Sequence, residues 1–286
     1  MGAAQEEQAE RAPELPPGRR LELPGRGSTF VRELAGPGGA PTIVLLHGWT
    51  VTSDLNWFTC YETLGRSFRV VALDHRGHGH GIKSKEPFSL EACADDVAAL
   101  VGELQLGPVI PVGYSMGGAI GQLVWQRHPG VVRGLVLAAT ARTFNTNRSE
   151  ALSFLGLGGL AVIARLAPDQ AREWMADQFI ARKGRTYEQW ALAEVKNNSI
   201  TNVLEAGSAL GRFSSRGWVG DVDVPTAVVV TTQDRTVPTR RQFRLAECIP
   251  NATMHRVPAG HDASFTAADQ FVPALLEACL GVAERS

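Results

Sequence analysis

The sequence predicts an α/β fold: a mainly parallel sheet of eight strands, helices on both faces of the sheet, and a helical insertion. Short runs of β-branched and aliphatic residues alternate along the chain with longer segments of helical periodicity. This alternation is typical of a parallel sheet covered by helices. It stops over residues 141–215, where about 75 positions contain no strand pattern but several plausible helices.

The expected strands are short and mostly apolar. Residues 42–46 are a continuous run of this kind, which is too short for a buried helix and indicates a strand covered on both faces. The full set of expected strands is 21–23, 29–34, 42–46, 69–73, 109–112, 134–138, 226–230 and 253–257.

The helical segments define the expected organisation of the chain. Ser89 is a candidate N-cap for the first helix, and Pro168 fits the first position of a helix inside the insertion. The expected helices outside the insertion cover 89–104, 116–127, 239–249 and 267–282. We therefore expect a core made of residues 21–140 and 216–286, a helical insertion over 141–215, and a flexible tail over 1–20.

Composition excludes several classes of protein. The 286 residues include 28 Lys and Arg against 29 Asp and Glu, so the chain has no basic footprint for nucleic acid. The longest apolar run, residues 154–167, is interrupted by Arg165 and falls short of the ~20 residues that span a membrane. Four separated cysteines and the lack of an apolar secretory segment at the N-terminus predict free thiols in a cytoplasmic protein.

The sequence Gly113-Tyr114-Ser115-Met116-Gly117 has the form G-x-S-x-G, and it lies between an expected strand and an expected helix. Such a turn needs small flanking residues, because the nucleophile has a strained conformation close to neighbouring backbone. Ser115 is therefore the candidate nucleophile. The alternative is a glycine-rich turn that only packs the helix against the strand.

A serine nucleophile needs a base, and the base needs an acid to orient it. Of seven histidines, His261 follows the last expected strand, and Asp234 follows strand 226–230. Both therefore belong at the carboxyl edge of the sheet, where sites on open α/β sheets gather. Three other acids are less suitable. Asp262 adjoins the histidine and is badly placed to reach its far ring nitrogen, whereas Asp221 and Asp223 precede the strand.

The chain order of nucleophile, acid and base differs from the orders in chymotrypsin-like and subtilisin-like enzymes. With these motifs, residues 29–284 resemble the α/β-hydrolase superfamily. Two more segments carry the resemblance: Leu45-Leu46-His47-Gly48-Trp49, similar to the HGx segment of that family, and Asp74-His75-Arg76-Gly77-His78-Gly79, similar to its D-x-R-G-x-G turn.

The resemblance implies that the backbone N–H groups of Trp49 and Met116 form the oxyanion hole and that residues 141–215 form a cap over the pocket. The expected reaction is hydrolysis of a carboxylic ester, or a similar acyl bond, of a small and largely apolar substrate through an acyl-enzyme on Ser115. No cofactor and no metal are expected. A zinc site of His75, His78 and His80 with Asp74 is disfavoured by tight, loop-like spacing.

Several alternatives stay open. The same three residues could serve a C–C bond hydrolase, a lactonase or a cofactor-free, haloperoxidase-like perhydrolase. A non-catalytic ligand-binding protein or a structural partner protein of the same fold is also possible. Serine at position 115 argues against haloalkane dehalogenases and typical epoxide hydrolases, which use aspartate there.

Apolar side chains of the insertion are candidates for the pocket wall, although packing in the core of the cap helices is the favoured role for most of them. They are Phe144, Phe154, Leu155, Trp174, Phe179 and Trp190. Residues 154–163 are almost wholly apolar, so we expect them to be covered or to face the pocket. His47 is expected to orient the oxyanion loop rather than to act in catalysis.

Overall fold

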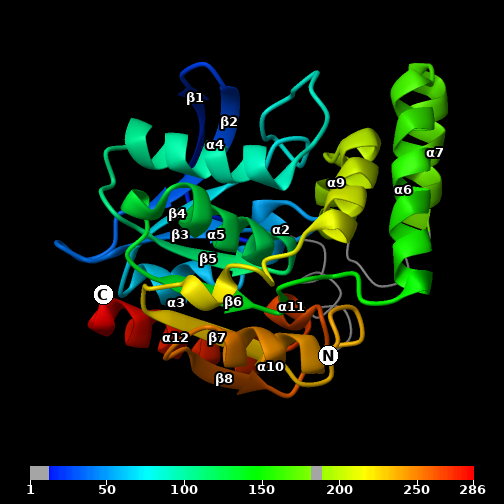
Figure 1. Ribbon diagram of the computed structural model, residues 1–286. Helices are drawn as coiled ribbons and strands as arrows, with labels where there is room; N and C mark the ends of the chain where they lie inside the picture. Colours follow the sequence, from blue (N-terminus) through cyan, green and yellow to red (C-terminus); the bar gives the residue numbers. More distant parts are fainter. Residues whose placement is uncertain (1–12, 182–188) are drawn as a thin grey trace, which may run out of the picture.

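The computed structural model describes residues 13–181 and 189–286, and it confirms the predicted fold class: an eight-stranded sheet, within the described residues, with helices on both faces (Figure 1). The strands are β1 (Gly18–Leu23), β2 (Gly27–Leu34), β3 (Thr42–Leu46), β4 (Arg69–Leu73), β5 (Ile110–Tyr114), β6 (Leu135–Ala138), β7 (Thr226–Thr231) and β8 (Thr253–Val257). Their order is β1-β2-β4-β3-β5-β6-β7-β8. The β1–β2 and β2–β4 pairs are antiparallel, and the other pairs are parallel.

Most helices connect consecutive strands. The core helices are α2 (Ser53–Trp57), α3 (Tyr61–Gly65), α4 (Leu90–Glu103), α5 (Met116–Arg127), α10 (Thr239–Cys248), α11 (Ala263–Thr266) and α12 (Ala268–Arg285), with short 3₁₀ turns η1 (Pro129–Val131) and η2 (Val219–Asp221). Four more helices lie between β6 and β7: α6 (Arg148–Leu166), α7 (Asp169–Ala181), α8 (Gln189–Lys196) and α9 (Ile200–Arg212).

The central strands are buried on both faces because their side chains alternate between two hydrophobic clusters. In β3, Val44 and Leu46 belong to the cluster that also contains residues of α4, α5 and α10, whereas Ile43 and Leu45 belong to the cluster that contains residues of α3 and α12. Every residue of β3 is buried. This is the pattern that the continuous apolar run predicted.

The helices α6 to α9 form one unit beside the sheet, which we call the cap (Figure 1). An isolated antiparallel bridge between Thr143 and Ser214 brings the two ends of this unit together. Helices α6 and α9 approach closely at Gly211, where a Cβ atom would lie 2.3 Å from the Cβ of Phe154. Glycine therefore sets the separation of these two helices.

The N-terminal boundary differs from the expectation of a flexible tail over residues 1–20. Strand β1 begins at Gly18, and its first residues pair with β2. The Arg19 guanidinium donates to Glu33 across this pair, at 2.6 Å between Nη2 and Oε1. Charged side chains here mark an edge strand that the search for apolar runs missed. Residues 1–12 lie outside the described residues.

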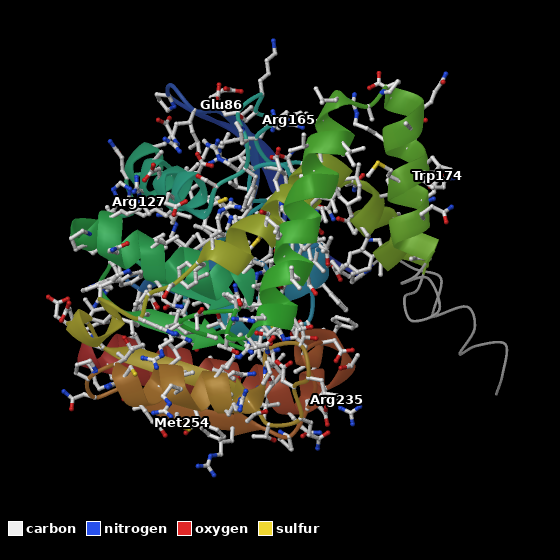
Figure 2. The ribbon with its side chains drawn as sticks, turned by 45° about the vertical axis from the view of Figure 1, so that its right-hand side comes forward. Glu86, Arg127, Arg165, Trp174, Arg235 and Met254 are labelled. Carbon is white, nitrogen blue, oxygen red and sulfur yellow. The ribbon has the colours of Figure 1, made fainter. Side chains whose placement is uncertain are left out.

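Helix α6 also differs from its expectation, because its apolar side chains are not all covered. Inward-facing Leu157, Ala161 and Ala164 pack in the cap core, but four large residues of segment 154–163 are exposed. These are Leu155, Leu160, Val162 and Ile163. Trp174 likewise projects outward from α7 (Figure 2). The sequence shows that the segment is apolar but not which side has a neighbour.

The expected interruption at Arg165 does not shorten this helix. The helix extends over 19 residues, and an 18-residue window of it has a mean hydropathy of 1.4, which by length and composition alone is enough to cross a membrane. Only 11% of that window is buried in the protein. Arg165 lies near the end of α6, where it donates to Glu205 of α9 (Figure 2).

The close contact at Gly211 is testable by adding one methyl group. Gly211→Ala forces α6 and α9 apart, and we expect it to destabilise the protein by about 1–3 kcal/mol. Gly159→Ala is the matched control, because Gly159 is also inside a cap helix and has no atom within 4 Å of a Cβ position. That control is expected to gain roughly 0.5–1 kcal/mol from helix propensity. Thermal unfolding followed by circular dichroism measures both, and a more stable Gly211→Ala protein would contradict the packing argument.

Candidate active site

Ser115 lies at the sharp turn between β5 and α5. Its backbone has φ 53° and ψ −111°, a conformation that non-glycine residues rarely adopt. The flanking glycines make the turn possible by close backbone contact. A Cβ atom at Gly113 would lie 2.2 Å from the carbonyl oxygen of Gly117, and one at Gly117 would lie 2.0 Å from that of Leu46. The turn therefore holds Ser115 against the end of β3.

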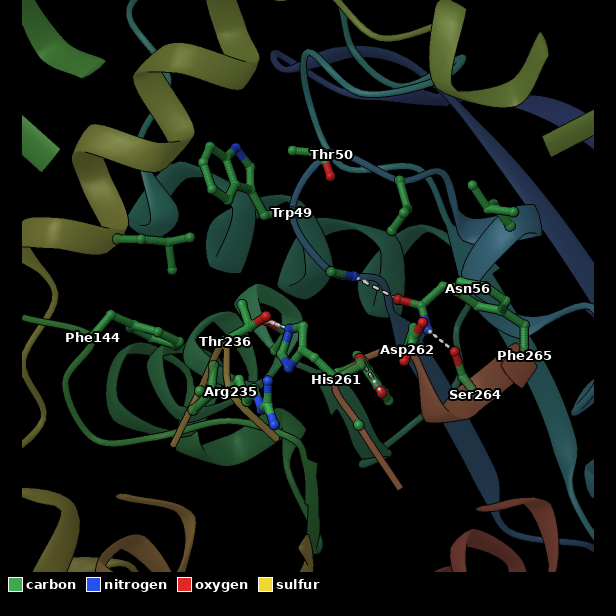
Figure 3. Close-up of a pocket in the computed structure, with 18 of the residues that line it drawn as sticks. Trp49, Thr50, Asn56, Phe144, Arg235, Thr236, His261, Asp262, Ser264 and Phe265 are labelled. Carbon is green, nitrogen blue, oxygen red and sulfur yellow. Dashed lines mark hydrogen bonds between the residues drawn. The ribbon is translucent and has the colours of Figure 1, made fainter. Parts of the chain in front are cut away.

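The structure brings the three predicted residues together although they are far apart in the sequence. The Nε2 atom of His261 is 2.9 Å from Ser115 Oγ, and its Nδ1 atom is 2.7 Å from Asp234 Oδ2. The Asp234 side chain is fully buried, whereas the His261 side chain is 23% exposed and faces the pocket (Figure 3). Tyr114 Oη donates to the His261 carbonyl at 2.7 Å and so anchors the loop that carries the imidazole.

Four further donors hold the Asp234 carboxylate. Oδ1 accepts from the backbone N–H groups of Thr236 and Val237, and Oδ2 accepts from Thr231 Oγ1 and Gln242 Nε2. The carboxylate is thereby aimed at the imidazole in one orientation. The sequence analysis missed Gln242, because a single amide on the amphipathic helix α10 carries no local signal of the residue it contacts.

The alternative acids do not bond to the imidazole. Asp223 Oδ1 accepts instead from the indole of Trp125, and Asp221 belongs to η2, before β7. Asp262 lines the pocket next to His261, but it is Asp234 that reaches Nδ1 (Figure 3). The geometry thus selects the acid that follows the carboxyl end of β7.

The two predicted oxyanion donors are free to bind. Among the described residues, neither the Trp49 nor the Met116 backbone N–H has an acceptor. The Gly48 N–H is occupied, since it donates to Asn56 Oδ1 at 2.7 Å (Figure 3). Asn56 in turn donates to Ser264 Oγ at 3.4 Å. Sequence analysis missed this buried asparagine, which fixes the loop after β3.

Above these groups lies a cavity of about 620 Å³ that opens beside Ser115 and His261. Of the cap residues proposed for its wall, Phe144 and Phe154 line it, together with Leu210 (Figure 3). The other candidates differ: Leu155 and Trp174 are exposed, Trp190 stacks edge-on against Phe58, and the side chain of Phe179 lies outside the described residues. The wall is mainly apolar, with charged Arg235 and Asp262 near its lower edge.

A family model for the alpha/beta hydrolase fold matches residues 41–268. The chain belongs to the α/β-hydrolase family. It is 31% identical over 248 residues to the putative carbamate hydrolase RutD of Agrobacterium fabrum, which covers 83% of this chain and 92% of that protein. It is 29% identical to the pimeloyl-[acyl-carrier protein] methyl ester esterase of Chromobacterium violaceum, over 84% of this chain and 94% of that one.

A solved structure, the enol-lactonase from Burkholderia xenovorans, superposes with a TM-score of 0.73 and 23% identity, and covers 92% of this chain and 100% of that one. At this identity the likeness shows the shared fold. The relatives and the family model together support hydrolase activity for this chain, and they leave its substrate open.

Three buried histidines of this α/β hydrolase gather at the loop after β3. His47 Nδ1 is 2.8 Å from the Gly48 carbonyl, and its Nε2 accepts from the His75 N–H at 2.9 Å. The ring of His78 lies 5.5 Å from that of His47. Burial lowers the pKa of His75 to about 3 and that of His78 to about 4, and it lowers that of His47 as well. The three rings are therefore neutral at pH 7. His47 supports the loop through its hydrogen bonds, and the rings of His75 and His78 pack against that of His47.

In the part of the chain that the structure describes, no group of three or more His, Cys, Asp or Glu side chains is arranged to hold a metal ion. Asp74, next to these histidines, instead accepts from the backbone N–H groups of Ser53 and His80. It thereby closes the D-x-R-G-x-G turn against the start of α2. Burial raises the pKa of Asp74 to about 7.

The buried histidines predict a loss of stability in mild acid. Below pH 6.5 these histidines bind protons in the unfolded chain but stay neutral in the folded protein. Each histidine therefore lowers the free energy of unfolding by up to about 1.4 kcal/mol for each unit by which the pH falls. Asp74 acts in the opposite direction between pH 7 and 3.8, because its folded pKa is raised. Because three histidines lower the stability and only Asp74 raises it, we expect the urea concentration at the unfolding midpoint to decrease when the pH is lowered from 7 to 5.

The variant His78→Phe keeps a ring in place and removes one titrating group, so its midpoint should depend less steeply on pH. Tryptophan fluorescence during urea titration measures both proteins. A midpoint that rises on acidification, or an unchanged slope in His78→Phe, would show that these rings do not control the pH dependence.

Proposed function

We propose that this α/β hydrolase cleaves a carboxylic ester, or a similar acyl bond, of a small and mainly apolar substrate through an acyl-enzyme on Ser115. The observation that carries the proposal is the continuous chain of hydrogen bonds from Ser115 Oγ through His261 to the buried Asp234. The series of hydrogen bonds begins at a mainly apolar cavity. The backbone N–H groups of Trp49 and Met116 have no acceptor among the described residues. A carbamate, a methyl ester and an enol lactone, named for the similar proteins, all present a carbonyl carbon to a nucleophile.

In the proposed reaction, Ser115 Oγ attacks the substrate carbonyl as His261 Nε2 takes its proton. The Nδ1–H of the resulting imidazolium donates to Asp234, which stays ionised. Trp49 and Met116 donate their backbone N–H groups to the oxyanion, and each such donor is typically worth about 3–4 kcal/mol.

The imidazolium then protonates the departing alkoxide, so the alcohol leaves and the acyl group stays on Ser115. Water enters the second half of the cycle and loses its proton to His261 as it attacks the acyl-enzyme. Collapse of that second oxyanion releases the carboxylic acid and returns the proton to Ser115. The catalytic groups end in the state in which they began, and no cofactor is consumed.

A fluorophosphonate probe and aryl-ester kinetics test this assignment. The probe should label Ser115, and Ser115→Ala should lose both labelling and nearly all esterase activity. Asp234→Asn should lower kcat by about 10⁴, because the imidazole then adopts the wrong tautomer. Asp223→Asn is the matched control: it is the aspartate bonded to Trp125, so kcat should stay close to that of the wild type.

Labelling at another serine would contradict the nucleophile, and near-normal kcat in Asp234→Asn would contradict the acid. A folded protein that neither binds the probe nor hydrolyses any aryl ester would favour the non-catalytic binding alternative. If the protein hydrolysed a C–C bond or formed a peracid instead of cleaving esters, the roles of Ser115, His261 and Asp234 would stand and the proposed reaction would be wrong.

The apolar wall predicts a preference for uncharged acyl groups of short to medium length. Each methylene buried against Phe144, Phe154 and Leu210 is worth up to ~0.8 kcal/mol, or about fourfold in kcat/KM. Phe154→Ala should therefore flatten the profile from acetyl to octanoyl esters. Leu155→Ala is the control, because this neighbour on α6 is 70% exposed. A profile that is flat in the wild type, or equally changed in both variants, would contradict the role of this wall.

A further inference from the structure

A second cavity, of about 250 Å³, lies outside the substrate pocket and is lined by five arginines. Arg142 comes from the segment after β6, Arg216 follows the cap, and Arg240, Arg241 and Arg244 belong to α10. None of these residues lines the substrate pocket. The two cavities are nevertheless neighbours along the chain, because Phe144 of the substrate pocket lies between two threonines of the arginine cavity, at 143 and 146.

The arginine cavity carries more positive charge than its neighbours neutralise. Arg241 pairs with Glu150, and Arg244 lies 3.9 Å from Glu247. Among the described residues, the guanidinium groups of Arg142, Arg216 and Arg240 have no carboxylate within ion-pair distance. Like charges in one cavity repel one another, and a bound anion removes that repulsion.

Arg241 supplies a donor that has no acceptor. Its side chain is 10% exposed, Nη1 donates to the Phe144 carbonyl at 2.8 Å, and Nη2 donates to Thr146 and Glu150. The Nε atom is buried and lacks any partner in the described residues. A buried N–H of a charged group without an acceptor is unfavourable, and it leaves this guanidinium incompletely satisfied by the protein.

The position of the cluster on α10 supports the same conclusion. Arg240 and Arg241 occupy the first turn of the helix, which contains no acidic residue. Cations at this end oppose the helix dipole, whereas an anion is stabilised there. The sequence thus places positive charge at the N-terminal end of α10, where it lowers the stability of the helix. Such a conflict between stability and sequence is typical of a binding site.

We propose that this cavity binds the phosphate group of a phosphate-bearing ligand, either free phosphate or a phosphate monoester. Guanidinium groups bind phosphate through paired N–H···O bonds, and a doubly charged phosphate matches three unneutralised arginines better than a carboxylate does. The site goes beyond the proposed hydrolase function and does not rest on it. Arg241 lines the arginine cavity and donates to the carbonyl of Phe144, which lines the substrate pocket, so this hydrogen bond links the two cavities.

Isothermal titration with inorganic phosphate, against sodium chloride of equal ionic strength, tests the site. The double variant Arg216→Gln/Arg240→Gln removes two exposed side chains that have no carboxylate partner among the described residues, and its unfolding temperature checks that it folds. We expect its phosphate affinity to fall at least about tenfold. The control Lys85→Gln/Lys196→Gln removes two exposed charges outside the cavity and should bind phosphate as the wild type does.

The outcomes separate the possibilities. No binding of phosphate or glycerol phosphate by the wild type, or an equal loss in the lysine control, overturns the proposal, the latter because it shows diffuse charge attraction. Acetate binding as tightly as phosphate overturns the phosphate class. Tighter binding of glycerol phosphate than of inorganic phosphate supports the site and identifies an organic phosphate as its ligand, whereas the reverse order supports the site and identifies free phosphate.

Discussion

The candidate site depends on a backbone contact between the first turn of α5 and the end of β3. Gly117 makes this contact, because a side chain there would lie 2.0 Å from the Leu46 carbonyl oxygen. The contact brings the loop after β3 against the turn that carries Ser115, and a Cβ atom at Gly48 would lie 3.6 Å from that of Ser115. Two glycines and the register of β3 with β5 thereby place the proposed nucleophile beside the loop that carries Trp49.

The rest of the site follows from the parallel part of the sheet, in which β3 to β8 present their carboxyl ends at one edge. Asp234 follows β7 and His261 follows β8, and these strands are paired in register from Ala227–Thr253 to Thr231–Val257. The distance between the two loops is thus set by backbone hydrogen bonds rather than by side chains. Thr231 and Gln242 then remove the remaining freedom of the Asp234 carboxylate.

Much of this arrangement could be predicted, because local patterns of apolar residues along the sequence indicate the strands. Continuous apolar runs located β3 and β4, and a weaker alternating pattern located β8, each with the bounds that the structure has. Residues that follow strands located the three members of the hydrogen-bonded chain. Local patterns do not show which side of an apolar helix has a neighbour. Residues 154–163 were therefore expected to be covered or to face the pocket, although one face of α6, which includes Leu155, is exposed.

The arginine cavity shows the same limit in a different form. Arg142 and Arg216 are separated by the whole cap, and the bridge between Thr143 and Ser214 brings their segments together. Sequence spacing does not predict such a cluster, because its members come together only when the chain returns to the sheet after the cap. Asn56 and Gln242 were missed for this reason too, since each acts on a residue that lies on another element.

The backbone of Ser115 has a consequence for how the protein can be observed. Its positive φ is maintained by the packing of β5, α5 and β3, and an unfolded chain has no reason to keep it. The orientation of the hydroxyl toward His261 is therefore a property of the assembled tertiary structure and not of the serine itself. On the proposed function, a reagent that reacts only with an activated serine would count native molecules in a mixture, and Ser115 would report on folding.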